Sequence, residues 1–177
     1  KFYLDQFGLL HQSAVELPEI GLPQYPARWG DISTMTISYG HGVSVSALQL
    51  ADGVAALVNG GIRLPVTLLK HRGTTPPAGI RVLSEQTSKQ MRALMRLVVT
   101  SGTGKNAAAP GYLVGGKTGT ADKQVNGRYG EKSLISSFVG TFPVDKPRFV
   151  ILAMLDEPKG TKRTFNYATG GWVAAPV

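Results

Sequence analysis

The spacing of apolar positions changes along the chain and divides it into a helix-rich first part and a strand-rich last part. In residues 46–59 the apolar side chains recur every three to four positions, which predicts a helix with one apolar stripe. Ser46 and Gln49 stand at the spacing of a capping box at its start, and Gly60-Gly61 ends it. The expected stripe consists of Leu50, Ala51, Val54, Leu57 and Val58.

Two further helices and an irregular connector are predicted in the same part of the chain. Ser84 is the expected N-cap of a helix that ends before Gly102. Residues 1–8 have the pattern of a helix end, with Gly8 just beyond the last turn. Residues 17–28 contain three prolines and are expected to form an irregular connector. The helix after Ser84 should bury Met91, Leu94, Met95 and Val98.

Three segments in the last part of the chain are predicted to be strands, because they are rich in apolar and β-branched residues. They are Val114–Ala121, Leu134–Phe142 and Arg148–Leu155. Asn126-Gly127 and residues 145–147 separate them, and both connections are too short for a helical crossover. We therefore expect an α+β fold in which an antiparallel sheet is flanked by helices, the last of which starts after Gly170-Gly171.

Composition and charge exclude several classes of protein. Of the 177 residues, 42% are hydrophobic and 17% are charged, which is typical of a folded domain rather than a disordered tail or a coiled coil. The absence of cysteine excludes disulfides and cysteine–zinc sites. The net charge of +8 comes from scattered basic residues without interleaved aromatic residues, which argues against nucleic acid as a partner. His11, His41 and His71 lack the spacing of a metal site, so we expect surface or loop histidines and no metal.

The segment from Gly111 to Thr120 matches two different motifs. As a phosphate-binding loop, Gly111-x4-Gly116-Lys117-Thr118 fits the pattern letter for letter, and a P-loop nucleotide-binding protein is one alternative. Such a loop requires a buried strand before its first glycine and a helix that begins at the Lys-Thr pair. Residues 107–110 are three alanines and a proline, and Gly119 follows directly after Thr118, so both flanks disfavour this interpretation.

As an extended strand, the same segment has a different chemistry. Thr118 and Thr120 project to one face, and Lys117 and Gly119 project to the other. Two hydroxyls and an ammonium group can then bind an anionic group such as the terminal carboxylate of a peptide. Gly119 allows a ligand backbone to come close. At a sheet edge, the free backbone groups could bind an extended peptide, and one N–H could stabilise an oxyanion.

These residues carry a resemblance to a known family. Lys117-Thr118-Gly119-Thr120-Ala121 resembles the third motif of the serine penicillin-recognising enzymes. Residues 38–51, Ser-Tyr-Gly-His-Gly-Val-Ser-Val-Ser-Ala-Leu-Gln-Leu-Ala, resemble the glycine-rich loop and following helix of class B penicillin-binding proteins, which usually have Thr-Pro at Ser46-Ala47. Further matches in family order are Phe7-Gly8 with Leu17-Pro18-Glu19, Gly102-Thr103-Gly104, and residues 170–177. The division type is resembled more than the elongation type.

The resemblance implies the transpeptidase fold that penicillin-binding proteins share with serine β-lactamases. Residues 1–177 would be the C-terminal portion of a single transpeptidase domain, truncated at both ends. In the family a serine attacks the penultimate D-alanine of a stem peptide, and the acyl-enzyme is resolved by the amine of a second stem. The chain contains neither Ser-x-x-Lys nor Ser-x-Asn. The nucleophile is therefore expected upstream, and the isolated fragment is predicted to be inactive.

Site residues follow from the same resemblance. Lys117 would support proton transfer, and the N–H of Thr120 would contribute to the oxyanion hole. Thr118, Gly119, Thr120 and Thr169 would bind substrate. Asp122 stands where some relatives have a basic residue, which leaves the role of the 122–128 loop open. Residues Tyr39 and His41 are expected to shape a loop, and Trp172 is expected in the core.

The expected partners are peptidoglycan stem peptides, β-lactam antibiotics and, through the parent protein, division proteins of the membrane. No metal or organic cofactor is implied. The resemblance places the domain on the periplasmic side of the bacterial inner membrane, with its anchor outside this chain. A non-catalytic relative that binds the cell wall stays open as a further alternative.

Overall fold

The structure, a computed structural model, describes residues 1–73, 77–125 and 128–177. The chain divides into two compact units, residues 1–88 and residues 89–177. The described helices include none that is long and apolar enough to cross a membrane.

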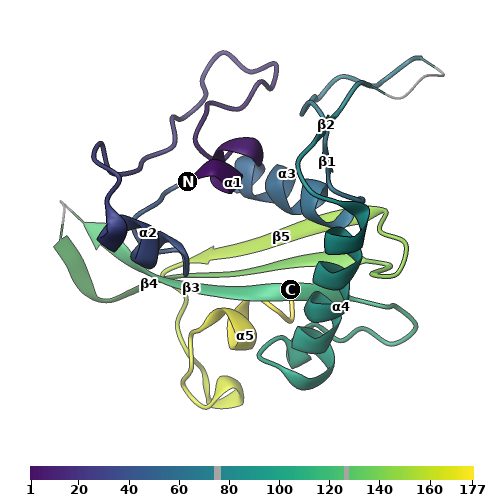
Figure 1. Cartoon of the computed structure of the whole chain (residues 1–177). Coiled ribbons are helices and arrows are strands. Elements are labelled where there is room, and N and C mark those ends of the chain that lie inside the picture. Colours follow the sequence, from purple (N-terminus) through teal and green to yellow (C-terminus); the bar gives the residue numbers. More distant parts are fainter. Residues whose placement is uncertain (74–76, 126–127) are drawn as a thin grey trace. The chain divides into compact units, whose positions relative to one another are not determined.

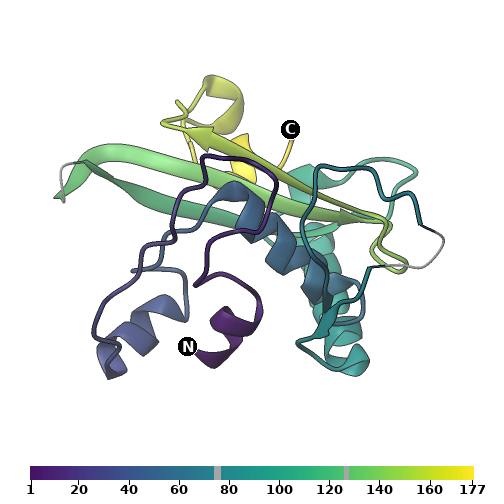
Figure 2. The same ribbon diagram turned by 90° about the horizontal axis from the view of Figure 1, so that it is seen from above.

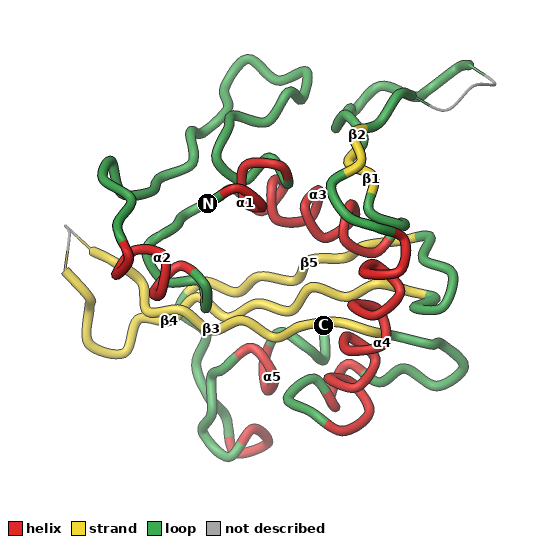
Figure 3. The backbone as a smooth tube through the Cα atoms, viewed as in Figure 1, coloured by secondary structure: helices red, strands yellow, loops and turns green. Residues whose placement is uncertain are grey.

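The first unit consists mainly of loops that connect short helices (Figure 3). Its elements are α1 (Phe2–Gln6), α2 (Asp31–Ile37), α3 (Ala47–Val58) and an antiparallel pair of β1 (Ile62–Arg63) with β2 (Ile80–Arg81). The predicted end of the first helix is confirmed, since Gly8 follows α1 with a positive φ of 76°. Helix α2 was not predicted, because its threonine, serine and isoleucine residues have low helix propensity and its Ile32 is 79% exposed.

Helix α3 confirms the predicted capping box. The Gln49 N–H donates to Ser46 Oγ at 3.2 Å, and the Ser46 N–H donates to Gln49 Oε1 at 2.9 Å. In the predicted apolar stripe, Val58 is fully buried, and Leu50, Ala51, Val54 and Leu57 are partly buried. The other buried positions are Gln49, Gly53 and Ala56. The missing side chain of Gly53 allows the segment after α1 to pack closely, because a Cβ atom there would lie 3.4 Å from the Leu9 side chain.

Helix α4 (Glu85–Ser101) begins in the first unit and continues into the second. The predicted N-cap is confirmed, since Ser84 Oγ accepts a hydrogen bond from the Thr87 N–H at 3.0 Å. Met95 is buried as expected, but Leu94 is 55% exposed, so its predicted burial is wrong. The buried line of the helix runs through Met95 and Val99, four residues apart, and Leu94 points about 100° away from it.

The second unit contains the predicted antiparallel meander (Figure 1). Strands β3 (Gly115–Val125), β4 (Arg128–Phe142) and β5 (Phe149–Asp156) pair in the order β3-β4-β5. The predicted turn at Asn126-Gly127 lies outside the described residues. Strand β3 pairs with β4 alone among the strands that the structure describes, so the Lys-Thr-Gly-Thr segment lies at an edge of this sheet.

Helix α5 (Gly170–Val173) lies beside β3 and β4, as Figures 1 and 2 show. The predicted last helix is thus confirmed, although it already begins at Gly170. Buried side chains of α4, β4 and the segment after α5 form one cluster, made of Val99, Phe138, Ala174 and Ala175. Two short 3-10 helices, η1 (Lys105–Ala107) and η2 (Lys162–Thr164), complete the unit.

Candidate functional site

The Lys-Thr-Gly-Thr segment lies inside strand β3 rather than in a loop. A phosphate-binding loop would require a helix that starts at Lys117, but residues 115–125 form a continuous strand paired with β4. Gly116 lies directly under the ring of Phe138, so its missing side chain makes room for core packing instead of a phosphate. The nucleotide-binding alternative is therefore wrong.

A pocket of about 450 Å³ lies in the second unit beside β3. Three of the predicted substrate-binding residues, Thr118, Thr120 and Thr169, line it together. The remaining lining residues are Gly102, Thr103, Lys105, Asn106, Gly171 and Trp172. Strand β3, the turn after α4 and the start of α5 thus contribute to one site. The alternation of a strand explains why Thr118 and Thr120 reach it together.

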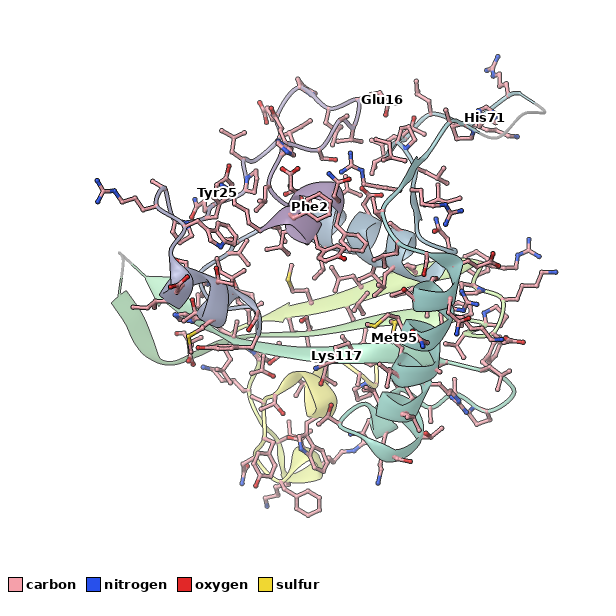
Figure 4. The ribbon with its side chains drawn as sticks, viewed as in Figure 1. Phe2, Glu16, Tyr25, His71, Met95 and Lys117 are labelled. Carbon is pink, nitrogen blue, oxygen red and sulfur yellow. The ribbon has the colours of Figure 1, made fainter. Side chains whose placement is uncertain are left out.

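Lys117 and Gly119 do not line this pocket. The exposed Lys117 side chain, labelled in Figure 4, donates from Nζ to the carbonyl oxygen of Thr118 at 2.7 Å. The expected convergence of its ammonium with the two hydroxyls is therefore not found in this arrangement. Gly119 has a structural reason of its own, since a side chain there would collide with the Ser137 hydroxyl on the paired strand.

Two glycines allow α5 to close the pocket. A side chain at Gly170 would collide with the carbonyl oxygens of Gly119 and Ser137, and one at Gly171 would collide with that of Thr103. Asn106 Nδ2 donates to the Gly171 carbonyl at 2.8 Å and so ties η1 to α5. The Gly-Gly pair therefore brings the helix start into direct contact with the strands and with the turn.

The threonine hydroxyls of the pocket are held in place by hydrogen bonds. Thr120 Oγ1 accepts a hydrogen bond from the Gly170 N–H at 3.0 Å. The Oγ1 atoms of Thr103 and Thr118 lie 2.7 Å apart and share a hydrogen bond. Gly102-Thr103-Gly104 matches the family in sequence, but the sequence predicted no role for Thr103. Only the fold shows that the hydroxyl of Thr103 meets that of Thr118, fifteen residues later.

Aromatic side chains lie next to the pocket. The Trp172 ring stacks on Tyr167 with a centroid distance of 5.8 Å, and Phe165 meets it edge-on at 5.6 Å. The prediction of Trp172 as a core residue is wrong, because its ring is half-buried and lines the pocket. The reason is that Ala174 and Ala175, not the tryptophan, enter the buried cluster of the unit. The pocket lining thus combines the aromatic ring of Trp172 with threonine hydroxyl groups.

Among the described residues, Lys105 is the only charged one that lines the pocket. Its ammonium group makes the site suitable for an anionic ligand.

Another lysine, Lys123, lies outside the pocket, at the far end of β3. Its Nζ lies 2.8 Å from Asp156 Oδ2 and 3.2 Å from Glu157 Oε1. The hydrogen bond to Asp156, and then that to Glu157, raises the pKa of Lys123, so this lysine is committed to an ion pair.

The histidines discussed for a metal site, and Tyr39 with His41, do not line the pocket. The described residues include no group of three side chains that could hold a metal ion. His11 Nε2 lies 2.7 Å from Asp5 Oδ1 in an exposed pair. Tyr39 and His41 lie in the exposed loop after α2, where the His41 N–H donates to the Thr36 carbonyl at 3.0 Å. The loop role predicted for this pair is therefore consistent with the structure.

Comparison with known proteins places these observations in context. The family model of the penicillin binding protein transpeptidase domain matches residues 1–177. The probable peptidoglycan D,D-transpeptidase FtsI of Caulobacter vibrioides is 43% identical over 184 residues, which cover 99% of this chain and 31% of that protein. The TP domain of penicillin-binding protein 3 from Burkholderia pseudomallei is 39% identical with a TM-score of 0.88, over 99% of this chain and 52% of that chain.

A second solved structure contains a ligand. Penicillin-binding protein 3 from Mycobacterium tuberculosis, complexed with ampicillin, is 30% identical with a TM-score of 0.86. That similarity covers 99% of this chain and 42% of that chain. The chain thus spans about a third of the curated relative and about half or less of the solved chains.

Proposed function

The chain belongs to the family of penicillin-binding protein transpeptidase domains, and on this premise we propose that it supplies the carboxylate-binding part of a peptidoglycan D,D-transpeptidase. The observation that carries the proposal is the pocket in which Thr118, Thr120 and Thr169 meet, where the charged lining residue in the described part of the chain is Lys105. Hydroxyl donors beside a cation suit a carboxylate. The terminal D-alanine of a stem peptide presents such a group.

In the proposed reaction the stem peptide lies along the free edge of β3. Thr118 and Thr120 donate hydrogen bonds to its terminal carboxylate, and the Thr120 N–H stabilises the oxyanion that forms at the attacked carbonyl. A serine that lies outside residues 1–177 is the nucleophile, and Lys117 supports the transfer of its proton. D-alanine leaves with that proton, and the amine of a second stem peptide then resolves the acyl-enzyme.

We propose that β-lactams occupy the same pocket through their carboxylate. The support is the family assignment together with a related protein that has been solved in complex with ampicillin. A role in cell division, division proteins of the membrane as partners, and a position on the periplasmic side of the inner membrane are proposals that rest on the family assignment and on the resemblance to the division type. The anchor would lie outside this chain.

The first experiment compares two proteins by intact-mass spectrometry after treatment with benzylpenicillin. One is the longer protein that contains this chain together with the upstream Ser-x-x-Lys region, and the other is residues 1–177 alone. We expect a covalent penicillin adduct on the longer protein only, because the nucleophile is proposed to lie upstream. An adduct on the fragment would contradict the proposed division of roles. No adduct on either protein would favour a non-catalytic, wall-binding relative.

The second experiment tests the pocket in the same longer protein. Thr118→Val and Thr120→Val each remove one donor to the carboxylate, so the rate of acylation by benzylpenicillin should fall roughly 10- to 100-fold, the range for a hydrogen bond to a charged group. Thr118→Ser and Thr120→Ser keep the hydroxyl and should retain most of the rate. Thr100→Val is the matched control, since its hydroxyl bonds to the Arg96 carbonyl of its own helix. Unchanged rates in both valine variants would overturn the proposed carboxylate site.

A further inference from the structure

The turn after α4 brings a third hydroxyl to the two threonines of strand β3. Thr103 Oγ1 lies 2.7 Å from Thr118 Oγ1, and both residues line the pocket. On the other side, the Gly170 N–H donates to Thr120 Oγ1 at 3.0 Å. The hydroxyls of Thr118 and Thr120 therefore each have a hydrogen-bond partner, and the two partners come from different segments of the second unit.

These partners decide where the hydroxyl protons point. A threonine hydroxyl has one proton to donate and two lone pairs that can accept. The Gly170 N–H fills a lone pair of Thr120 Oγ1, which leaves the Thr120 proton free for a ligand in the pocket. If Thr103 donates to Thr118, the Thr118 proton becomes free in the same way. An anion in the pocket favours this direction, because it attracts the protons of both β3 threonines.

We propose that Thr103 is a positioning residue for the substrate carboxylate: it donates to Thr118 Oγ1 and so directs the Thr118 proton into the pocket. The inference rests on the proposed function of the same site. Thr103 does not itself touch the carboxylate in this scheme. Its effect passes through Thr118, and the chain of two hydrogen bonds strengthens the bond to the anion because each donor polarises the next.

The backbone around Thr103 is held rigidly enough for this role. The N–H groups of Gly102 and Gly104 both donate to the Val98 carbonyl, at 3.1 and 3.0 Å, and fix the turn that carries Thr103. Gly171 packs directly on the Thr103 carbonyl. Asn106 holds Gly171 from the same side through a hydrogen bond of 2.8 Å to its carbonyl. The hydroxyl is thus pre-organised before a ligand arrives, which reduces the free-energy cost of ordering on binding.

The test uses the longer protein that contains this chain and two probes, benzylpenicillin and its methyl ester. The ester lacks the negative charge, so its acylation rate should be almost insensitive to the orientation of the Thr118 proton. We expect Thr103→Val to slow acylation by benzylpenicillin about fivefold, the effect of one neutral hydrogen bond. The same variant should leave the rate with the ester unchanged. Thr103→Ser keeps the hydroxyl, so its rate of acylation by benzylpenicillin should stay close to that of the unaltered protein. Thr100→Val should change the rate with neither probe.

A double variant separates action through Thr118 from direct contact with the ligand. If Thr103 acts through Thr118, Thr103→Val combined with Thr118→Val should be no slower than Thr118→Val alone. Additive losses would instead mean that Thr103 contacts the carboxylate directly, and would overturn the positioning role. If Thr103→Val slowed acylation by benzylpenicillin and by its methyl ester equally, the role of Thr103 would be structural only. That result would also overturn the positioning role. If the unaltered protein is not acylated by benzylpenicillin at all, the proposed function fails and the inference fails with it.

Discussion

The two units of the chain use their polar side chains in different ways. In residues 1–88, long polar side chains bind the backbone of their own unit. Gln49 Nε2 donates to the His11 carbonyl at 2.6 Å, and Arg63 donates to the Gln6 carbonyl at 3.0 Å. Glu16 accepts the Leu68 N–H at 2.9 Å, and the Glu16 side chain is labelled in Figure 4. In residues 89–177, by contrast, several short hydroxyl side chains line a pocket.

This difference follows from the amount of regular structure in each unit. Loops have no ladder partners, so side chains must satisfy the backbone groups that the loops bury. In the three-stranded sheet of the second unit, the hydrogen-bond ladders satisfy the backbone groups between paired strands. Two threonines of the sheet, Thr118 and Thr120, line the pocket, where their hydroxyls can meet a ligand. Substitutions in the first unit should change stability alone, and those at the pocket should change acylation.

The largest effect on stability and on acylation is expected at Gly170, where α5 packs against strands β3 and β4. Gly170→Ala would push a methyl group into the carbonyl oxygens of Gly119 and Ser137. Because both obstacles are backbone atoms of paired strands, α5 must move, which should cost about 3 kcal/mol of stability. The same movement breaks the hydrogen bond from the Gly170 N–H to Thr120. In the longer protein that contains this chain, we therefore expect a lower thermal unfolding midpoint together with strongly reduced acylation by benzylpenicillin.

Gly21→Ala is the control for this substitution. Gly21 has open space at its side-chain position, and its φ lies outside the left-handed region. The control should keep both the unfolding midpoint and the acylation rate. If Gly170→Ala also behaved like the unaltered protein, the close approach of α5 to β3 and β4 would not be needed to form the pocket.

A smaller effect, confined to stability, is expected at Gln49. Its side chain is buried and bonds to the His11 carbonyl and to the Ser46 N–H, at 2.6 and 2.9 Å. Gln49→Ala leaves these backbone groups without a partner and should cost about 2 kcal/mol. Thermal unfolding measures the loss, with the exposed Gln90→Ala as the matched control. A change in the selectivity for benzylpenicillin over its methyl ester would contradict the expectation that substitutions in the first unit affect stability alone.

The smallest effect is expected at Asp52, through pH. Partial burial raises the pKa of the Asp52 carboxyl group, and the nearby Arg63 charge opposes this only in part. The folded state therefore binds the proton more tightly than the unfolded state, so stability falls as pH rises through the raised pKa. Asp52→Asn removes the buried charge and should raise the unfolding midpoint slightly at pH 7. The gain should shrink at pH 4, and a loss of stability at pH 7 would show that the attraction of Arg63 dominates.

Local patterns predicted much of the fold. The capping box of Ser46 and Gln49, the N-cap at Ser84 and the three antiparallel strands all depend on residues close in sequence. Predictions that depend on which neighbour covers a side chain were weaker. Leu94 has the pattern of a buried residue but is exposed, and Trp172 contributes to a pocket wall instead of the core. Helix α2 was missed because its residues have weak local preference for a helix.

The sequence by itself determined that Thr118 and Thr120 share one face, because side chains in a strand alternate with a period of two. Its motifs also indicated the family to which the chain belongs. Only the tertiary structure decided that Thr103, Lys105 and Thr169 join those threonines around one pocket and that Lys117 stays outside it. The physical reason is that these contacts join segments distant in sequence, and they form only because Gly170 and Gly171 let the backbone of α5 approach the sheet and the turn.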